Sequence, residues 1–269
     1  MSRIAETFER RLYQLSPCLV TYVTAGDPDL AKSREILLAI DRGGADVIEV
    51  GVPFSDPIAD GPTIQRASER ALAAGCNLGA TLDLIASVRT ELSAPVVLFS
   101  YVNPVLRHGV DAFVDRAADA GVDGVLLLDL PIEESASMRE KLDRRAMDQI
   151  FLVSPTTSDA RLAEAARLGR GFLYAISRLG VTGARDAVAR SAQPLAARIR
   201  AITTLPIAVG FGLSRPEHIR DVSTFADAAV VGSALVQVIA GASANGGDPA
   251  ARAGEFVHWL KTGERARAN

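Results

Sequence analysis

The chain has 269 residues, of which 48% are hydrophobic and 23% charged, and its formal net charge at pH 7 is −3. This balance is typical of one large or two small globular domains and argues against a disordered or fibrous protein. The weak acidity, the lack of any apolar run long enough to cross a membrane and the charged N-terminal residues lead us to expect a cytoplasmic protein with no nucleic-acid or membrane partner.

Short apolar runs recur along the chain, each followed by a turn and a longer amphipathic stretch. The runs are rich in Val, Ile and Leu without clean alternation, as expected of parallel strands that are covered on both faces. We predict strands at Cys18–Val23, Val47–Val50, Val96–Tyr101, Gly124–Leu128, Gln149–Val153, Phe172–Ile176, Ile207–Phe211 and Ala228–Gly232.

Helix-like stretches separate these strands. We predict them at Leu30–Asp41, Thr63–Ala74, Thr81–Glu91, Asp111–Ala120, Glu133–Arg144, Ala160–Leu168, Pro194–Ala201 and Pro216–Val222, with further helices at Ile4–Leu12 and Phe256–Lys261. Thr157 or Ser158 is expected to cap one helix, and Ser214–Glu217 has the pattern of a capping box.

Eight strands alternating with helices predict an α/β fold, a (β/α)8 TIM barrel with an extra N-terminal helix, as one domain over residues 1–269. A doubly wound open sheet is the structural alternative. The stretch Ser177–Ala192 is long for a loop between a strand and a helix and is a candidate lid, whereas Gly241–Pro249 is small and polar and is expected to be a surface connection.

Glu49 is the strongest candidate for chemistry because it lies near the carboxyl end of the second predicted strand, among Val and Ile residues. A buried, unpaired carboxylate is costly, and its pKa rises. In a barrel this end of the strand faces the active-site mouth, where such a group can both give and take protons near neutral pH. A structural pairing with an arginine is the competing interpretation. Asp56 and Asp60 follow in the next loop and supply further carboxylates, although each alone is an ordinary turn residue.

Two glycine motifs near the end indicate an anion site. Gly210–Gly212 closes the seventh predicted strand, and Gly232 with Ser233 closes the eighth and opens a helix. Barrel enzymes often bind phosphate here with backbone N–H groups at a helix N-terminus. The Gly180–Gly183 stretch of the sixth loop is a candidate third wall, and ordinary turns are the alternative explanation for each motif.

Residues that the chain lacks narrow the chemistry further. Its three lysines, Lys32, Lys141 and Lys261, fall on predicted helices or near the tail, which argues against a Schiff base inside the barrel. The three histidines do not form a pair at metal-ligand spacing, and two cysteines cannot build a disulfide framework. Acid–base catalysis by carboxylates, without a metal or a bound cofactor in this chain, is what remains.

The stretch Glu49–Gln65, EVGVPFSDPIADGPTIQ, resembles the signature of the tryptophan synthase α-subunit family. The resemblance covers almost the whole chain, because Thr24–Pro28, Asp129–Ser135, Ser177–Gly183 and the two late glycine motifs follow in the family's order.

That resemblance implies a (β/α)8 lyase that splits indole-3-glycerol phosphate into indole and D-glyceraldehyde 3-phosphate by retro-aldol cleavage. It implies that Glu49 protonates C3 of the indole ring and helps to remove the proton of the glycerol hydroxyl, that Asp60 stabilises charge on the indole N–H, and that Tyr174 supports the site. The implied phosphate and loop contacts are Thr182, Gly183, Phe211, Gly212, Gly232 and Ser233, and the implied indole wall is Tyr22, Ile64, Phe99 and Leu126. Tyr22 departs from the phenylalanine expected there.

The resemblance also implies a partner, the tryptophan synthase β subunit, in an α2β2 heterotetramer. Pyridoxal phosphate is expected in that β subunit, which receives indole through a tunnel, and the loop carrying Asp56 and Pro57 would lie near it. Three alternatives stay open: a stand-alone lyase that releases free indole, a non-catalytic subunit that only activates its partner, and a sugar-phosphate isomerase. Retention of both Glu49 and Asp60 argues against the non-catalytic subunit.

Overall fold

Eight parallel strands form a closed barrel in the computed structural model, which describes residues 1–14, 16–176, 185–210 and 212–264 and, over 185–191, the backbone alone. Each strand pairs with the next, and β1 closes the ring against β8. The strands are β1 (Cys18–Thr24), β2 (Val47–Gly51), β3 (Val96–Ser100), β4 (Gly124–Leu127), β5 (Asp148–Val153), β6 (Leu173–Ile176), β7 (Ile207–Gly210) and β8 (Ala228–Val231). The predicted barrel is confirmed, and the open sheet is wrong.

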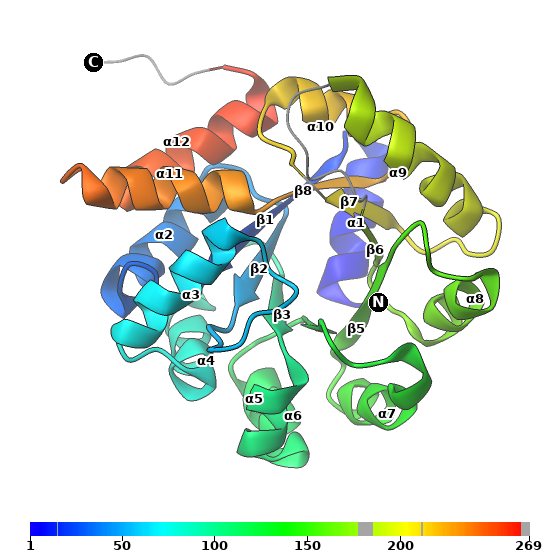
Figure 1. Cartoon of the computed structure of the whole chain (residues 1–269), viewed down its shortest axis with the longest axis horizontal. Coiled ribbons are helices and arrows are strands. Elements are labelled where there is room, and N and C mark those ends of the chain that lie inside the picture. Colours follow the sequence, from blue (N-terminus) through cyan, green and yellow to red (C-terminus); the bar gives the residue numbers. More distant parts are fainter. Residues whose placement is uncertain (15, 177–184, 211, 265–269) are drawn as a thin grey trace.

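Helices surround this barrel as an outer ring (Figure 1). In chain order they are α1 (Arg3–Tyr13), α2 (Leu30–Arg42), α3 (Pro62–Ala73), α4 (Leu78–Val88), α5 (Val102–His108), α6 (Val110–Asp119), the 3-10 turn η1 (Ile132–Glu134), α7 (Ala136–Arg144), α8 (Asp159–Leu168), α9 (Arg185–Arg200), α10 (Pro216–Ser223), α11 (Ser233–Ala244) and α12 (Pro249–Thr262). Because the ring covers the outer face of the sheet, the strands read as continuous apolar runs.

Some predicted helix boundaries are wrong. Helix α9 starts at Arg185 and carries Pro194 in its interior, whereas proline favours the first turn of a helix and led us to place the start there. The predicted connection Gly241–Pro249 is partly helical, because α11 runs to Ala244. Of the candidate lid, residues 177–184 lie outside the described part of the chain.

Capping was predicted correctly at one helix and wrongly at another. Ser158 caps α8, as its side chain accepts a hydrogen bond from the backbone N–H of Arg161. The predicted capping box before α10 is wrong, since Arg215 is the N-cap residue and the N–H of Ser214 donates to Nδ1 of His218 at 3.2 Å.

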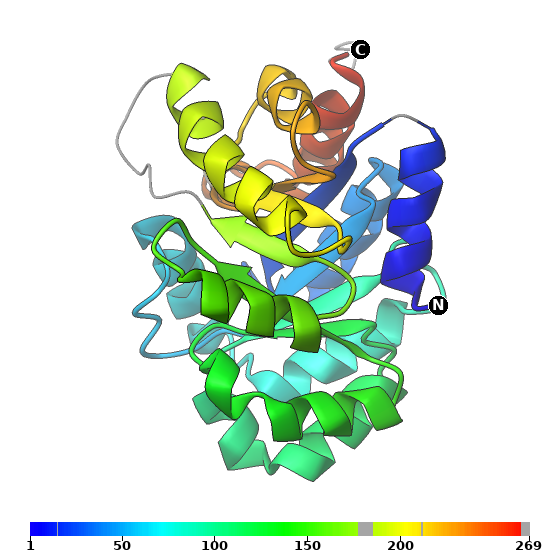
Figure 2. The same ribbon diagram turned by 90° about the vertical axis from the view of Figure 1, so that its right-hand side faces the viewer.

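Helix α1 closes the amino-terminal end of the barrel. Ile4 is fully buried and Phe8 is 5% exposed, and both pack in the cluster that fills the barrel interior. The ring of Phe8 lies 5.5 Å from that of Phe172. In Figure 2 the strand arrows point away from α1. A functional site is therefore expected at the opposite end, where the carboxyl ends of the strands meet.

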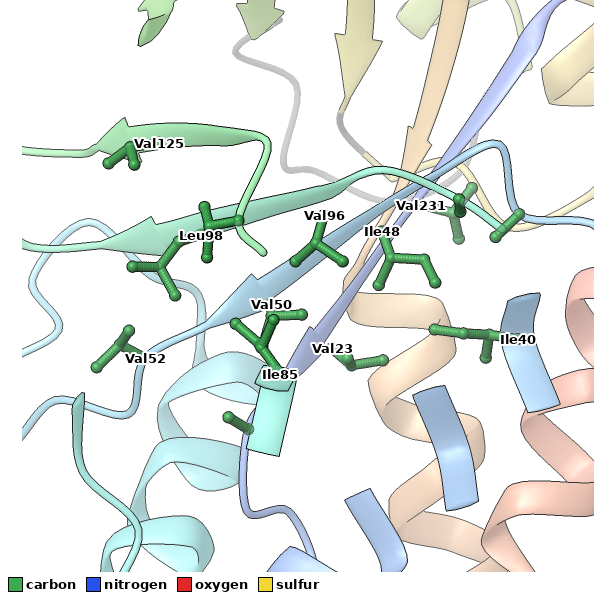
Figure 3. Packing of buried hydrophobic residues seen from close by; sticks show 14 of the residues in the cluster. Val23, Ile40, Ile48, Val50, Val52, Ile85, Val96, Leu98, Val125 and Val231 are labelled. Carbon is green, nitrogen blue, oxygen red and sulfur yellow. The ribbon is translucent and has the colours of Figure 1, made fainter. Parts of the chain in front are cut away.

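A second core lies between the barrel and its helices. The outward-facing side chains of β2 contribute to it: Ile48 lies toward Ile40 of α2, and Val50 lies toward Ile85 of α4 (Figure 3). Burying each such side chain contributes about 1.5–3 kcal/mol. Both faces of β2 are thus packed, and the packing on its outer face fixes the strand that carries the inward residues.

No single described helix is long and apolar enough to cross a membrane, although α3 and α4, which meet at a bend of 90°, have the length and composition together.

Candidate active site

Glu49 lies inside the barrel on β2 and is 1% exposed. Its ladder partners are Tyr22 on β1 and Val97 on β3. Among the described residues no group hydrogen-bonds its Oε1 atom. Because burial removes the water that would solvate the charge, its pKa rises from 4.5 to about 8. At pH 7 most of this group is a neutral acid that can give a proton and then take one back.

Two tyrosines share the space around Glu49. Burial, followed by the charge of Glu49, raises the pKa of Tyr174 on β6. Burial, followed by the charge of Asp60 and then by that of Glu49 among smaller effects, raises the pKa of Tyr22 on β1. Both hydroxyls therefore stay protonated. Because Glu49 acts on both tyrosines and Asp60 acts on Tyr22, the residues predicted to be catalytic, Glu49, Asp60 and Tyr174, surround one space.

Two glycines make room for the tyrosine hydroxyls. A Cβ atom on Gly51 would lie 2.1 Å from the hydroxyl oxygen of Tyr22, and one on Gly210 would lie 2.4 Å from that of Tyr174. Atoms essentially never approach this closely, so any side chain at either position must displace its tyrosine.

Aromatic and aliphatic side chains form one wall of the barrel mouth. The rings of Tyr22 and Phe99 meet edge to face, with centroids 5.2 Å apart. Ile64 of α3 packs on Tyr22 in the same cluster. Leu126 is the ladder partner of Phe99 but is fully buried in the barrel interior, so it lies below the other wall residues. The four residues predicted to hold an indole ring are thus neighbours.

Asp60 lies in the loop between β2 and α3 and is half-buried. Its Oδ2 atom accepts a hydrogen bond of 3.1 Å from the hydroxyl of Tyr101. Its backbone is held as well, because its N–H donates to the carbonyl of Pro57 and its carbonyl accepts from Nε2 of Gln65. Burial raises the pKa of the Asp60 carboxyl, and the hydrogen bond from Tyr101 opposes that rise. The loop thus presents one carboxylate with a set orientation.

The ends of β7 and β8 carry the candidate anion site. Gly210 pairs with Val230, so the segments that follow, with Gly212 and Gly232, leave the barrel side by side. Gly212 has φ +66° and faces open space. Gly232 is the N-cap residue of α11, with no side-chain cap, and Ser233 is the exposed first residue of that helix. The first N–H groups of such a helix are available to an anion.

Three further predicted contacts, Thr182, Gly183 and Phe211, lie outside the described residues. Gly232 links the anion site to the aromatic wall, because a Cβ atom there would lie 3.4 Å from Cβ of Tyr22. The anion site and the aromatic wall could therefore bind the anionic group and the ring of one small molecule.

The contact of Tyr101 with Asp60 and the role of Gly51 were missed, and Gly210 was predicted for the anion site but not as the residue that makes room for Tyr174. Tyr101 was predicted as a strand-end residue that could line a pocket, but its contact with Asp60 joins segments 41 residues apart in the chain. The weak signal that could have found Gly51 is its spacing, since a glycine two residues after Glu49 lies on the same inward face of the strand.

Comparison with known proteins gives a consistent match. The family model described as "Tryptophan synthase alpha chain" matches residues 8–263. A tryptophan synthase alpha chain from Geotalea uraniireducens (strain Rf4) is 49% identical over 266 residues, covering 99% of each chain. One from Methylococcus capsulatus (strain Bath) is also 49% identical and covers 90% of this chain and 91% of its own.

Solved structures agree. The tryptophan synthase subunit alpha of Legionella pneumophila str. Paris superposes with a TM-score of 0.90 at 35% identity, covering 97% of both chains. A chain of tryptophan synthase from M. tuberculosis, in an aminoacrylate-bound form, superposes with a TM-score of 0.87 at 34% identity, covering 98% of this chain and 100% of its own.

Proposed function

The chain belongs to the tryptophan synthase alpha chain family, and from this premise we propose that it cleaves indole-3-glycerol phosphate to indole and D-glyceraldehyde 3-phosphate. Membership makes it a lyase of tryptophan biosynthesis. The observation that carries the proposed reaction is the buried carboxyl of Glu49 inside the barrel, with one oxygen unpartnered and its pKa raised to about 8.

Glu49 supplies the proton transfers. Its neutral carboxyl gives a proton to C3 of the indole ring, which interrupts the aromaticity of the pyrrole ring and makes the bond to the glycerol carbon breakable. That bond then breaks, and its electron pair returns to the ring. The glycerol hydroxyl loses its proton to the Glu49 carboxylate and becomes the aldehyde. One proton is given and one is taken, so Glu49 ends as it began.

Asp60 stabilises the protonated ring. Protonation at C3 places positive charge on the ring nitrogen, and a carboxylate that accepts a hydrogen bond from the N–H lowers the energy of that state more than that of the substrate. Tyr174, whose pKa is raised in part by the Glu49 charge, supports the site as a neutral hydroxyl beside it.

The phosphate of the substrate belongs at the amino end of α11. Gly232 and Ser233 offer backbone N–H groups there, and Gly212 lets the neighbouring segment approach closely. We assign Thr182, Gly183 and Phe211 to the same end of the substrate on the family resemblance alone. The indole ring then lies against Tyr22, Ile64 and Phe99, above Leu126.

We propose that this chain works without a cofactor of its own. Its three lysines lie on the surrounding helices, and each is paired with a carboxylate: Lys32 with Glu35, Lys141 with Asp111 and Lys261 with Asp46. None of them is placed to form a Schiff base inside the barrel. Pyridoxal phosphate is assigned to the β subunit.

We also propose that the loop between β2 and α3 faces the β subunit in an α2β2 heterotetramer. Ile58 on this loop is 88% exposed, which is unusual for a large aliphatic side chain. An earlier part of the same loop, including Phe54, lines a cavity of about 400 Å³ together with residues of α4 and α5. A partner that covers Ile58 would also contact the loop that carries Asp60.

The test is a steady-state assay of indole release by the purified chain, with and without a β subunit. We expect slow release by the chain alone and a rise of at least about tenfold with the partner, because a loop held closed over substrate speeds such reactions. An isomerisable sugar phosphate is the control substrate, and Glu49→Gln is the control variant.

Each alternative has its own outcome. Fast release that the β subunit does not change indicates a stand-alone lyase. Activation of the partner without any cleavage indicates a non-catalytic subunit. Turnover of the sugar phosphate with none of indole-3-glycerol phosphate overturns the proposal.

A further inference from the structure

Tyr101 joins three parts of the barrel mouth. It follows β3 directly and is the N-cap residue of α5, and it is 3% exposed. The first N–H of α5, that of Val102, donates to Oδ1 of Asp129 at 2.7 Å, which anchors the start of this helix to the loop after β4. The ring of Tyr101 packs 5.1 Å from that of Phe54. The backbone and the ring of Tyr101 are therefore both held by contacts that do not involve its hydroxyl.

The hydroxyl makes two hydrogen bonds, and their directions are determined. The backbone N–H of Ala59 donates to the hydroxyl oxygen at 3.0 Å, and Oδ2 of Asp60 lies 3.1 Å from the same oxygen. Since an N–H group can only donate, the hydrogen of Tyr101 is left for the Asp60 carboxylate. The backbone of the loop thus orients the hydroxyl, and the hydroxyl orients the side chain of the next residue.

The surrounding charges favour this direction. Burial and then the charge of Asp60 raise the pKa of Tyr101, with Asp129 adding to the rise, so its hydroxyl stays a donor. Burial raises the pKa of Asp60, and the bond from Tyr101 is the opposing effect. Among the described residues, Tyr22 of β1 and Glu49 of β2 are further titratable groups that face this space. Tyr101 therefore favours the charged form of Asp60 where burial disfavours it.

We propose that Tyr101 is a positioning residue for Asp60: its one hydroxyl keeps the carboxylate ionised, aimed into the barrel and tied to the loop backbone. The inference rests on the proposed function in one respect, because it takes Asp60 to face the indole N–H. It goes beyond that function by assigning to a residue outside the predicted site the task of holding the electrostatic partner of the ring in its working state.

The first test measures Asp60 itself and needs no turnover. The full chain is labelled with 13C at aspartate carboxyls, the Asp60 signal is assigned by its loss in Asp60→Asn, and its pKa is measured by NMR titration. In Tyr101→Phe, which keeps the ring on Phe54, we expect that pKa to rise by about one unit. Tyr13→Phe is the matched control, because it removes the hydroxyl of a tyrosine that is 81% exposed on α1 at the other end of the barrel, and it should leave the Asp60 pKa unchanged.

The second test is kinetic and uses the chain with its β subunit. In Tyr101→Phe the acid limb of the kcat/KM profile should move up by the same amount, since more Asp60 is neutral at a given pH. We expect kcat to fall about tenfold and KM to change less than about threefold. In an Asp60→Asn background, Tyr101→Phe should cost nothing further.

The outcomes separate the two proposals. An unchanged Asp60 pKa, or losses that multiply in the double variant, overturns the role of Tyr101 while leaving the proposed function intact. No cleavage by the parent chain, together with the expected pKa shift, overturns the proposed function and supports the contact. If Tyr101→Phe fails to fold, 3-fluorotyrosine at position 101 replaces it. This stronger donor should lower the Asp60 pKa, and a pKa that does not move overturns the inference.

Discussion

Glu49 shows how one residue obtains its chemistry from its surroundings. A solvated glutamic acid is ionised at pH 7 and is a poor proton donor. Inside the barrel it is 1% exposed, and its Oε1 atom has no hydrogen-bond partner among the described residues. Loss of solvation raises its pKa, and no cation in the described part of the chain offsets this rise. The same burial that makes the group unfavourable for stability makes it suitable for catalysis.

We predict that Glu49→Gln lowers kcat by at least about a hundredfold, because the amide can neither give nor take the transferred proton. Binding of glycerol 3-phosphate should change less than about twofold, since the anion site lies at α11. The measurements are indole release and isothermal titration. Activity that survives the substitution would show that the proton comes from another group.

The pH dependence of the free energy of unfolding should also reveal the raised pKa of Glu49. Between pH 4.5 and about 8, native Glu49 keeps a proton that the unfolded chain has released. The free energy of unfolding therefore falls as pH rises through this range. Glu49→Gln does not titrate, so the free energy of unfolding of the variant minus that of the parent should increase by about 4 kcal/mol from pH 5 to 8.5.

Urea unfolding at several pH values measures this difference. Burial also raises the pKa values of Asp60, Asp123 and Asp148, but these groups are present in both chains and cancel in the comparison. A difference that is constant with pH would contradict the buried-acid interpretation of Glu49.

At the scale of elements, neighbouring strands decide which inward side chains fit. Tyr174 of β6 lies against Gly210 of β7, and Tyr22 of β1 lies against Gly51 of β2. Each tyrosine ring thus lies over a glycine of the next strand, where no side chain occupies the space. The helix that follows β8 begins uncapped at Gly232, and this gives the mouth its N–H groups.

Substituting Gly210 by alanine should displace the Tyr174 ring, because the new Cβ atom would lie 2.4 Å from its hydroxyl oxygen and 2.6 Å from Cε2. We expect a loss of about 1–3 kcal/mol in the free energy of unfolding. In a Tyr174→Ala background the loss should shrink. Gly241→Ala is the matched control, since a Cβ atom at that helical position meets nothing within 4 Å. Equal losses in both backgrounds would contradict the clash.

Ser233→Asp should separate helix stability from anion binding. A carboxylate in the first turn of α11 is favourable for the helix, by about 0.3–1 kcal/mol, yet repels a phosphate at the same N–H groups. We expect affinity for glycerol 3-phosphate to fall at least about tenfold while the melting temperature does not fall. Ser233→Ala, which adds no charge, should have a much smaller effect on affinity. Unchanged affinity in Ser233→Asp would remove the anion site from this helix.

At the scale of the whole molecule, one buried carboxylate ties the two ends of the described chain to the barrel. Asp46, whose side chain is 1% exposed, pairs with Arg11 of α1 and Lys261 of α12. It also accepts a hydrogen bond of 2.7 Å from the backbone N–H of Leu19 in β1. The helix that closes the barrel floor and the last described helix thus share one anchor.

Asp46→Ala should therefore lower the free energy of unfolding by about 3 kcal/mol, because two cations and an N–H group lose their partner. Asp83→Ala is the control: its ion pair with Arg116 is exposed and should contribute less than about 1 kcal/mol. Urea denaturation of the three proteins gives both values. A loss at position 46 no larger than that at position 83 would show that α1 and α12 do not depend on this anchor.

The sequence alone determined the strands, the barrel and the identity of Glu49, Asp60 and the late glycines as candidates. These follow from local patterns, since apolar periodicity and an acid among Val and Ile residues can be read within a few positions. The short helix α5 escaped prediction because Tyr101 and Asp129, which start and anchor it, come from different loops.

Only the tertiary structure decided which of these residues act together. Pairing of β1 with β2 places Tyr22 beside Glu49, and packing of the loop after β2 against the end of β3 brings the hydroxyl of Tyr101 to Asp60 across 41 residues of chain. Such contacts depend on strand register and on how rings pack beside glycines. These are properties of residues distant in the chain, so no local pattern records them.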